Sequence, residues 1–254
     1  PTGLMYEQFG KIGLNPATAV TFEDDFDYAT QVLADASWVP INTTYGRVNI
    51  STDKLDFDFD TGDGNGDKQV YHDLTTVGTN WTIRFKLNWS ALTSQSNAYM
   101  YIGLTDSTGS TDTNQNGFMM RFINAPTASM EYVNFGVNQV NNTGPRQLGG
   151  GGNNMVYTTA KDYYVEMKKD GTTLTGTMFE NSDFTGTWQT ATQTITTTIT
   201  PSLRYLHFWN SMSANTGIWE GTIDDVEFYN GVTTINWAKN LYLIWEWIYN
   251  HGIS

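Results

Sequence analysis

The densest group of potential metal ligands in the sequence is an acidic, glycine-rich stretch between Asp56 and Asp67. Calcium binds about six to eight oxygen ligands from carboxylates, amides and carbonyls on a loop flexible enough to surround it. Four oxygen-bearing side chains of this stretch fit that demand best: Asp60, Asp63, Asn65 and Asp67. Counted from Asp63, an EF-hand needs Gly where Lys68 stands and Glu where Leu74 stands. The stretch therefore predicts a calcium loop of another type, with a solvated acidic turn as the alternative.

Two acidic pairs near the ends of the sequence, Asp24-Asp25 and Asp224-Asp225, form a second candidate metal site. The apolar residues of the last predicted strand change face at the second pair: Trp219 and Ile223 precede it, Val226 and Phe228 follow it. A strict two-residue period does not allow this change, so we expect a β-bulge there. We also expect the first and last strands to lie side by side, where calcium would relieve the repulsion between the carboxylates. The alternative is that each pair lies in water.

Aromatic residues are more abundant than a core of this size needs, and they are candidates for carbohydrate binding. The apolar face of a sugar ring stacks on Tyr or Trp, and such sites need few charges. The candidate stacking residues are Tyr99, Tyr101, Tyr164, Trp188, Tyr205, Trp209 and Trp219. Their candidate hydrogen-bonding neighbours are Arg121, His207, Glu220 and asparagine side chains. The alternative is that these aromatic residues simply cover the second faces of the predicted sheets.

Signals for catalysis are weak, and we expect a protein without enzymatic activity. The chain has three histidines and contains no Gly-x-Ser-x-Gly, phosphate-loop or zinc motif. The stretch from Thr222 to Glu227 superficially resembles the catalytic strand of family 16 glycoside hydrolases, but Thr222 stands at the position of the nucleophilic glutamate. A divergent glycoside hydrolase therefore remains the third choice.

The composition limits the classes of partner. The 254 residues carry a net charge of −13, which argues against nucleic acids and anionic membranes as partners. The chain has no cysteine, so disulfides and thiolate metal sites are excluded. Five asparagines match the N-glycosylation pattern, with chance occurrence as the alternative: Asn42, Asn49, Asn80, Asn88 and Asn141. We expect an extracellular or cell-surface protein in which calcium supplies stability that disulfides do not.

Short strands at regular spacing predict one all-β domain over residues 18–231. The clearest strand is Trp81–Trp89, in which apolar and polar residues alternate. A hairpin is predicted through Asp170-Gly171, a helical turn between Tyr28 and Ala36, and a flexible polar loop over Asn138–Asn154 that includes Gly149–Gly152.

The two ends of the chain differ from the predicted β domain. For residues 1–17 we expect an irregular lead-in segment that is rich in apolar residues. Residues 232–254 predict an amphipathic C-terminal helix, with apolar residues at helical spacing: Trp237, Leu241, Ile244, Trp245 and Ile248. Either end is a candidate surface for self-association, and the helix is too short and interrupted to span a bilayer.

Three motifs together resemble the concanavalin A-like lectin/glucanase superfamily, closest to its laminin G-like and pentraxin-like jelly rolls. They are Phe22–Phe26 followed by Trp38, Tyr163–Gly171, and Gly221–Tyr229. The resemblance covers about residues 18–231 and implies a two-sheet antiparallel jelly-roll β-sandwich with a concave ligand face. It also implies calcium, with Asp24, Asp25, Asp224 and Asp225 as its ligands. The lead-in, the Gly149–Gly152 loop and the C-terminal helix lie outside the resemblance.

The favoured interpretation is a non-catalytic, extracellular, calcium-stabilised β-sandwich that binds carbohydrate. The alternative is a self-assembling structural subunit of a surface layer, filament or virion, joined through residues 1–17 or 232–254.

Overall fold

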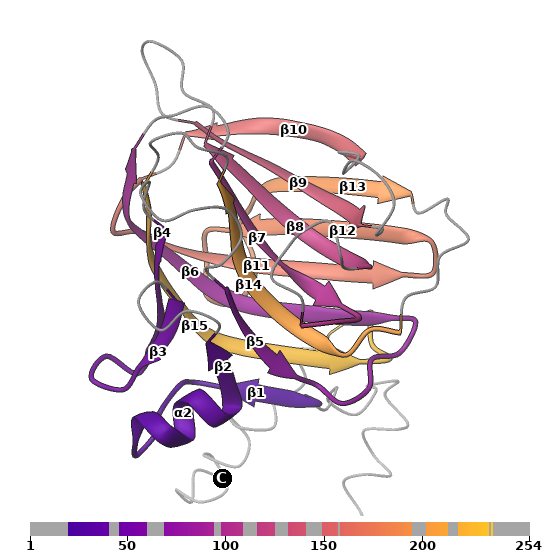
Figure 1. The fold of residues 1–254 in the computed structure, drawn as a ribbon. Helices are drawn as coiled ribbons and strands as arrows, with labels where there is room; N and C mark the ends of the chain where they lie inside the picture. Colours follow the sequence, from indigo (N-terminus) through magenta and orange to yellow (C-terminus); the bar gives the residue numbers. More distant parts are fainter. Residues whose placement is uncertain are drawn as a thin grey trace, which may run out of the picture.

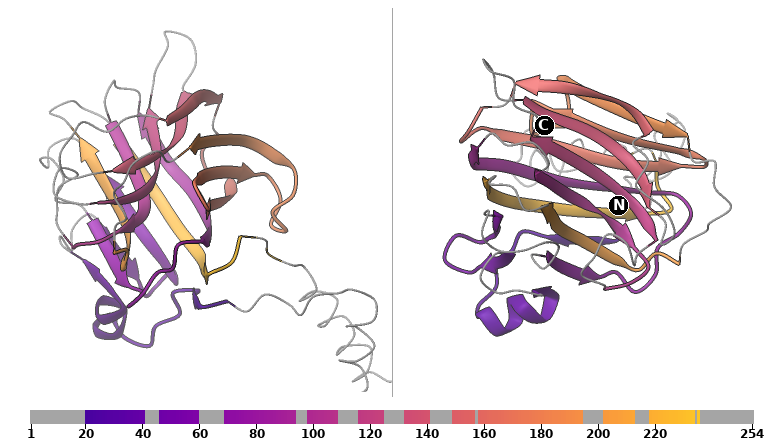
Figure 2. Two further views of the ribbon diagram at one scale, coloured as in Figure 1. Left: turned by 90° about the vertical axis from the view of Figure 1, so that its right-hand side faces the viewer. Right: turned by 45° about the horizontal axis from the view of Figure 1, so that its top comes forward.

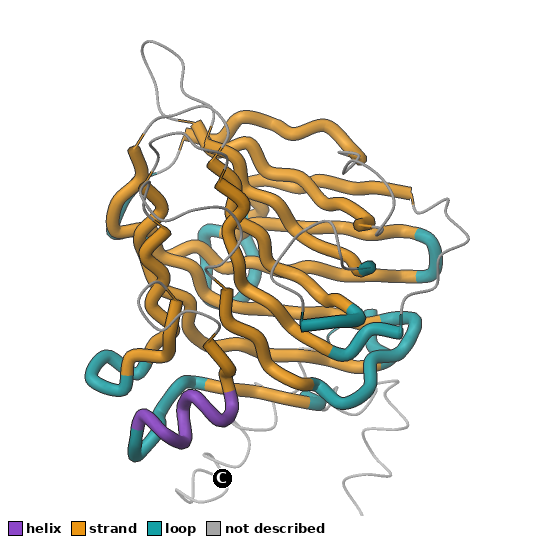
Figure 3. The backbone as a smooth tube through the Cα atoms, viewed as in Figure 1, coloured by secondary structure: helices purple, strands orange, loops and turns teal. Residues whose placement is uncertain are grey.

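A computed structural model of the chain describes residues 20–40, 46–59, 69–93, 98–108, 116–124, 132–140, 149–156, 158–194, 202–212, 218–233 and 235. Strands dominate these residues, with one short helix near the start (Figure 3). The elements are β1 (Phe22–Asp24), α2 (Gln31–Ser37), β2 (Trp38–Pro40), β3 (Gly46–Asn49), β4 (Lys54–Phe59), β5 (Gln69–Asp73), β6 (Trp81–Thr93), β7 (Ala98–Thr105), β8 (Gly117–Asn124), β9 (Tyr132–Val140), β10 (Gly149–Val156), β11 (Asp162–Asp170), β12 (Thr173–Phe179), β13 (Thr187–Thr194), β14 (Tyr205–Met212) and β15 (Ile218–Asn230).

The strands form two antiparallel sheets that pack face to face (Figures 1 and 2). Sheet A has the order β13-β12-β11-β6-β15-β4-β3, and β1 also pairs with β15. Sheet B has the order β10-β9-β8-β7-β14-β5-β2. The predicted all-β sandwich is therefore confirmed.

The core lies between the sheets and follows the period-two alternation of their strands. On β6 the alternate residues from Trp81 to Trp89 are fully buried, and on β7 Met100, Ile102 and Leu104 face them from sheet B. Thr82 and Arg84, which alternation places on the outer face, are also buried. A further layer of side chains therefore covers part of the outer face of sheet A.

The seam between the first and last strands has the predicted form. β1 pairs with β15 in antiparallel register, with Phe22 opposite Phe228 and Asp24 opposite Val226. The pairing of β15 with β6 shifts register between Asp224 and Glu227, and Asp225 has a φ of 51°. This shift is the β-bulge expected from the apolar pattern.

Local signals are confirmed at two places and wrong at a third. The hairpin β11–β12 turns at Gly171, whose φ of 55° lies in the left-handed region that glycine adopts without steric cost. Helix α2 begins after Thr30, which accepts a hydrogen bond from Leu33 N as an N-cap. Gly149–Gly152, expected in a flexible loop, instead belong to β10, which pairs with β9. Sheet pairing there overrides the low strand propensity of glycine. The predicted lead-in 1–17 and most of the predicted helical segment 232–254 lie outside the described residues.

Candidate functional site

The outer face of sheet B carries most of the residues proposed for carbohydrate binding. Residues directly opposite each other in neighbouring strands share a face, so the register of β7, β8 and β14 places them. Tyr101 lies opposite both Arg121 and Trp209, and Tyr99 lies two residues along β7 on the same side. His207 lies opposite Gly103 of β7 and Tyr71 of β5. Five positions far apart in the sequence therefore share this face: Tyr99, Tyr101, Arg121, His207 and Trp209.

An aromatic cluster occupies this face where β5 meets β14. Tyr71 is stacked on His207, with ring centroids 5.5 Å apart, and its ring meets Tyr205 edge-on at 5.6 Å. Tyr205 also meets His207 at 6.2 Å in a T-shaped arrangement. Both tyrosines are half-buried, whereas His207 beside them is fully buried. Their exposed ring surfaces form a small aromatic platform.

A charged pair borders the platform. The Arg204 guanidinium donates to both carboxylate oxygens of Asp73, over 2.8 Å and 2.6 Å, and lies 5.3 Å from the Tyr205 ring centroid. Hydrogen bonding from Arg204 lowers the pKa of Asp73 below its usual range. The pair therefore stays ionised and offers a fixed set of donors and acceptors beside the rings.

Burial separates the proposed residues on this face. Tyr101, Arg121 and His207 are 1%, 6% and 0% exposed. Desolvation lowers the pKa of His207 to about 3, against the opposing effect of a hydrogen bond with the Ser107 backbone. His207 is therefore neutral at physiological pH and packs against both tyrosines of the platform. Among the side chains that the structure describes on this face, only those at the β5–β14 end are exposed enough to contact a ligand.

Trp219 and Glu220, two further residues of the predicted set, lie elsewhere. They belong to β15 of sheet A, where Trp219 is opposite Phe59 of β4 and Glu220 is opposite Asp58. Sequence reasoning grouped them with the others by residue type, and only strand pairing separates them. It also missed Tyr71, Asp73 and Arg204 as members of a site. The alternation of Val70 with Tyr71 was the available signal for the first of these.

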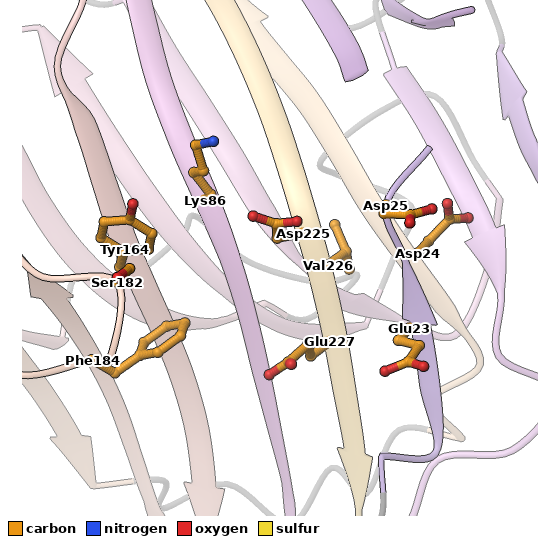
Figure 4. Close-up of a pocket in the computed structure, with 10 residues that line it drawn as sticks. All are labelled: Glu23, Asp24, Asp25, Lys86, Tyr164, Ser182, Phe184, Asp225, Val226 and Glu227. Atoms are coloured by element: carbon orange, nitrogen blue, oxygen red, sulfur yellow. The ribbon is translucent and has the colours of Figure 1, made fainter. Parts of the chain in front are cut away.

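A hollow lies on the outer face of sheet A, at the seam between β1 and β15. It has a volume of about 660 Å³, and Figure 4 shows its side chains spread over β11, β6, β15 and β1. The lining residues are Glu23, Asp24, Asp25, Lys86, Tyr164, Ser182, Phe184, Asp225, Val226 and Glu227. The hollow is strongly acidic, because five carboxyl groups face a single lysine in this lining.

The bulge gives Asp225 an unfavourable electrostatic setting. Burial raises its pKa, and so do the nearby carboxylates of Asp224, Asp25 and Glu227, while Lys86 acts in the opposite direction. Lys86 lies 3.3 Å from Asp224 and 3.6 Å from Asp162, so its charge is shared with those two carboxylates. Glu227 accepts a hydrogen bond of 2.7 Å from the Tyr229 hydroxyl. A cation here would offset the repulsion around Asp225.

The predicted calcium ligands do not share one environment. The carboxylate of Asp24 already accepts three hydrogen bonds within the fold, from Phe26 N (2.7 Å), Trp38 Nε1 (2.8 Å) and the Tyr28 hydroxyl. Asp25, Asp224 and Asp225 lie around the bulge. Within the described ranges, no three acidic or histidine side chains are arranged to hold a metal ion. The Asp60–Asp67 loop, with Asp63 and Asn65, lies outside those ranges.

Three of the five candidate glycosylation asparagines are described, and each makes a side-chain hydrogen bond. Asn49 donates to Asp56 (2.6 Å), Asn88 donates to Asp162 (2.7 Å), and Asn80 accepts from Gly171 N (2.9 Å). A glycan on Asn49 or Asn88 would be attached to the nitrogen that makes this contact and would compete with it. Asn42 and Asn141 lie outside the described residues.

Comparison with known proteins places the fold. No family model and no curated protein matches the sequence. Solved structures do match: the carbohydrate recognition domain of Emp47p has a TM-score of 0.56 at 10% identity, covering 85% of this chain and 98% of its own. The legume lectin-like domain from Entamoeba histolytica has a TM-score of 0.53 at 10% identity, covering 85% and 100%. The exoplasmic/lumenal domain of VIP36, solved with Ca²⁺ and Man3GlcNAc, has a TM-score of 0.52 at 11% identity, covering 81% and 93%.

These matches define the class of fold: the chain has a concanavalin A-like lectin fold, as the sequence motifs implied. At this level of identity the likeness extends to the fold alone. In the described part of the chain, no helix is long and apolar enough to cross a membrane.

Proposed function

We propose that this chain is a lectin-like, carbohydrate-binding β-sandwich that binds sugar on the outer face of sheet B. The observation that carries the proposal is the half-buried pair of Tyr71 and Tyr205 beside the ionised pair of Arg204 and Asp73. An aromatic platform next to fixed hydrogen-bonding groups is the combination that recognises a pyranose, which is apolar on one face and polar at its rim. The VIP36 domain of similar fold was solved with a bound glycan, which supports the same class of ligand.

The side chains of the platform are preorganised, which favours binding of a neutral ligand whose individual contacts are weak. His207, opposite Tyr71 on the neighbouring strand, is stacked against its ring and restricts its movement. The two-point contact with Asp73 fixes the Arg204 guanidinium. A sugar therefore meets groups that have already lost much of their side-chain entropy, which lowers the cost of association. In the register of β14, Trp209 lies opposite Tyr101 of β7 and Gln69 of β5.

Calcium forms the second part of the proposal. A calcium ion at the seam, held by Asp25, Asp224 and Asp225, would offset the mutual repulsion of their carboxylates and join β1 to the bulge of β15. These side chains would have to converge, since they do not form a ligand set in their present arrangement. Structures of similar fold were solved with Ca²⁺ or with potassium, which supports cation binding. An extracellular or lumenal location, where calcium is plentiful, fits this proposal.

The decisive experiment is a glycan array probed with the full chain, with calcium and then with chelator, followed by titration calorimetry on the best ligand. Tyr71→Ala and Tyr205→Ala should each weaken binding by about tenfold, the order expected for loss of one aromatic stacking contact. Tyr164→Ala is the matched control, because Tyr164 is also half-buried but lies on the outer face of sheet A. Equal loss in all three variants, or no glycan bound by the wild type, would reject this site.

A structural subunit assembled through the chain ends is the second candidate. One observation favours it: Thr21 N donates to Phe228 O (2.8 Å), and Asn230 N donates to Thr21 Oγ1 (2.9 Å). Residues 1–17 and 232–254 therefore join the sandwich close to one another and can act together. Light scattering of chains lacking either segment tests this, because loss of large particles on deletion would favour assembly over glycan binding.

A further inference from the structure

Among the described residues, three large apolar side chains are exposed, and they lie at one corner of the sandwich. Val32 and Leu33, in the first turn of α2, are 78% and 54% exposed. Ile50, directly after β3 in its turn to β4, is 37% exposed. The Gln31 side chain of α2 donates to the Val48 carbonyl of β3 over 2.9 Å, so the helix begins beside that turn (Figure 1). We call the three exposed side chains the α2 corner.

The fold itself does not require apolar residues at this corner. Ala34 is buried and attaches α2 to the core, and Thr30 caps its first turn. Neither contact involves the side chains of Val32 or Leu33. A polar residue is the usual choice on the solvent side of a helix, and exposed apolar side chains that gather at one place mark interaction sites. The α2 corner therefore indicates contact with another apolar segment.

The sequence supplies such a segment after β15. Residues 241–249 read Leu-Tyr-Leu-Ile-Trp-Glu-Trp-Ile-Tyr, in which Glu246 is the only charged residue. Burial of one large apolar side chain is worth about 1.5–3 kcal/mol, so exposure of this whole stretch to water is costly. A helix would place the apolar residues of the segment on one side: Trp237, Leu241, Ile244, Trp245 and Ile248. That side needs an apolar surface to cover it.

Hydrogen bonds fix the point at which the chain leaves the sandwich. Gly231 N donates to Asn80 O, and Thr82 Oγ1 donates to Val232 O, both over 2.8 Å. These contacts hold the end of β15 against the start of β6. The apolar segment that follows therefore begins from a known position on the sandwich.

The α2 corner lies within reach of that position. In the register of sheet A, Val48 of β3 pairs with Leu55 of β4, which pairs with Ile223 of β15. The corner is therefore separated from Gly231 by two strand spacings and by the stretch of chain back to Ile223, about 28 Å in all. Residues 233–248, with the first four extended and the rest helical, span about 31 Å. The segment is long enough to lie over the corner.

We propose that residues 237–249 form a helix that docks on the α2 corner of the same chain. Attachment to β15 gives the segment an effective concentration in the millimolar range, which favours its own chain over a second copy. The net charge of −13 on each copy also opposes docking between copies. Residues 1–17 fit less well, because their apolar residues lack helical spacing. Docking would join the end of β15 to α2 and reinforce the seam at β1, which pairs with β15.

A helix docked on its own chain leaves no apolar side free to join a neighbouring copy. Docking of this kind therefore opposes assembly through the chain ends, the second candidate function above. It is independent of glycan binding on sheet B, so either can fail without the other.

Disulfide trapping tests the docking, because the chain has no cysteine of its own. In Leu33→Cys/Ile244→Cys, mild oxidation of dilute protein should form a disulfide within one chain, seen by mass spectrometry and by faster migration without reductant. The control is Thr172→Cys/Ile244→Cys. Thr172 follows Gly171, whose N donates to Asn80 Oδ1, so it lies closer to the origin of the segment than Leu33 does. We expect trapping at Leu33 to be about tenfold faster than at Thr172, whereas an undocked segment would favour Thr172.

Hydrogen exchange of residues 237–249 measures the docking without added cysteines. These amides should be protected in the wild type, and Leu33→Asp should speed their exchange by about tenfold, because it places a charge in the apolar contact. Aspartate is favourable in the first turn of a helix, so α2 itself stays folded. Thr52→Asp is the matched control: it adds the same charge at an exposed residue of the turn between β3 and β4 and should leave the protection unchanged.

Three results would overturn the proposal. The first is trapping at Thr172 that is as fast as trapping at Leu33. The second is a disulfide that forms only between chains, which would make a second copy the occupant of the corner. The third is a lack of protection in the wild type, or equal exchange in Leu33→Asp and Thr52→Asp.

Discussion

The outer faces of the two sheets hold two arginine–carboxylate pairs in opposite environments. On sheet A, Arg84 contacts Glu166 at 2.6 Å and lies 4.2 Å from the Phe184 ring centroid, with only 7% of its side chain exposed. On sheet B, Arg204 contacts Asp73 at the same 2.6 Å, but its side chain is 49% exposed. The same chemical pair is thus sealed under an aromatic ring in one place and open to solvent in the other.

The comparison indicates a division of roles. A buried ion pair that loses one partner leaves an uncompensated charge, so it stabilises one arrangement of the surrounding residues. An exposed ion pair contributes little to stability and keeps its hydrogen-bonding capacity for a ligand. We therefore assign Arg84 and Glu166 to the architecture of sheet A, and Arg204 and Asp73 to recognition on sheet B. The predictions below test this division.

The largest expected effect is that of Arg84→Ala. It removes a buried cation and leaves the Glu166 carboxylate without this partner, so the free energy of unfolding should fall by about 3–5 kcal/mol. Urea denaturation followed by tryptophan fluorescence measures it. Lys161→Ala, which removes an exposed pair with Glu180 on the same sheet, is the control and should change little. Equal effects of the two substitutions would contradict the role assigned to Arg84.

The second-largest expected effect is a pH dependence of the stability of the fold, caused by His207 beside the sheet B platform. Its pKa in the folded chain, about 3, lies below the usual 6.5, so the unfolded chain takes up a proton first as the pH falls. Stability is therefore complete above about pH 6.5 and declines toward pH 3. Urea denaturation between these limits should show the decline, and His207→Gln should reduce its slope. An unchanged slope would mean that the buried imidazole does not govern acid sensitivity.

The third effect concerns the acidic seam on sheet A. The pKa of Asp225 is raised, so the folded chain holds its proton more tightly and stability falls as the pH rises through that pKa. Asp225→Asn removes the penalty and also suits the φ of 51°, which Asn tolerates. In chelator, its melting temperature at pH 7 should rise slightly above that of the wild type. With calcium, the wild type should gain stability and the variant should gain less; equal gains would exclude Asp225 as a ligand.

Much of the fold was predictable because it depends on short-range alternation. The face change between Ile223 and Val226 indicated the bulge, and the pattern of Trp81–Trp89 indicated a central strand. Two features were not predictable locally. Arg84 is buried because Phe184, a hundred residues later, covers it. Gly149–Gly152 belong to β10 because Gly149 and Asn153, on either side of a register shift, pair with β9.

The candidate site was predictable only in part, because it depends on strand order. Aromatic content pointed to Tyr101, His207 and Trp209, whose positions in the register of β7 and β14 fall on one side of sheet B; that they bind a ligand stays a prediction. The same reasoning included Trp219, which pairing assigns to the other sheet. The pairing of β5 with β14 is what brings Tyr71 to His207, and no spacing within either segment encodes it.

The smallest effect on stability, and the sharpest test of the comparison, is Arg204→Lys. Lysine keeps the charge but cannot hold both oxygens of Asp73 in one plane, so the border of the sheet B platform loses its fixed geometry. Because the pair is exposed, the melting temperature should hardly change. Glycan affinity, measured by titration calorimetry, should fall several-fold, whereas Lys161→Arg on sheet A should leave it unchanged. An Arg204→Lys variant that binds normally would show that this pair, like that of Arg84, has no part in recognition, and the difference between the two faces would then be one of burial alone.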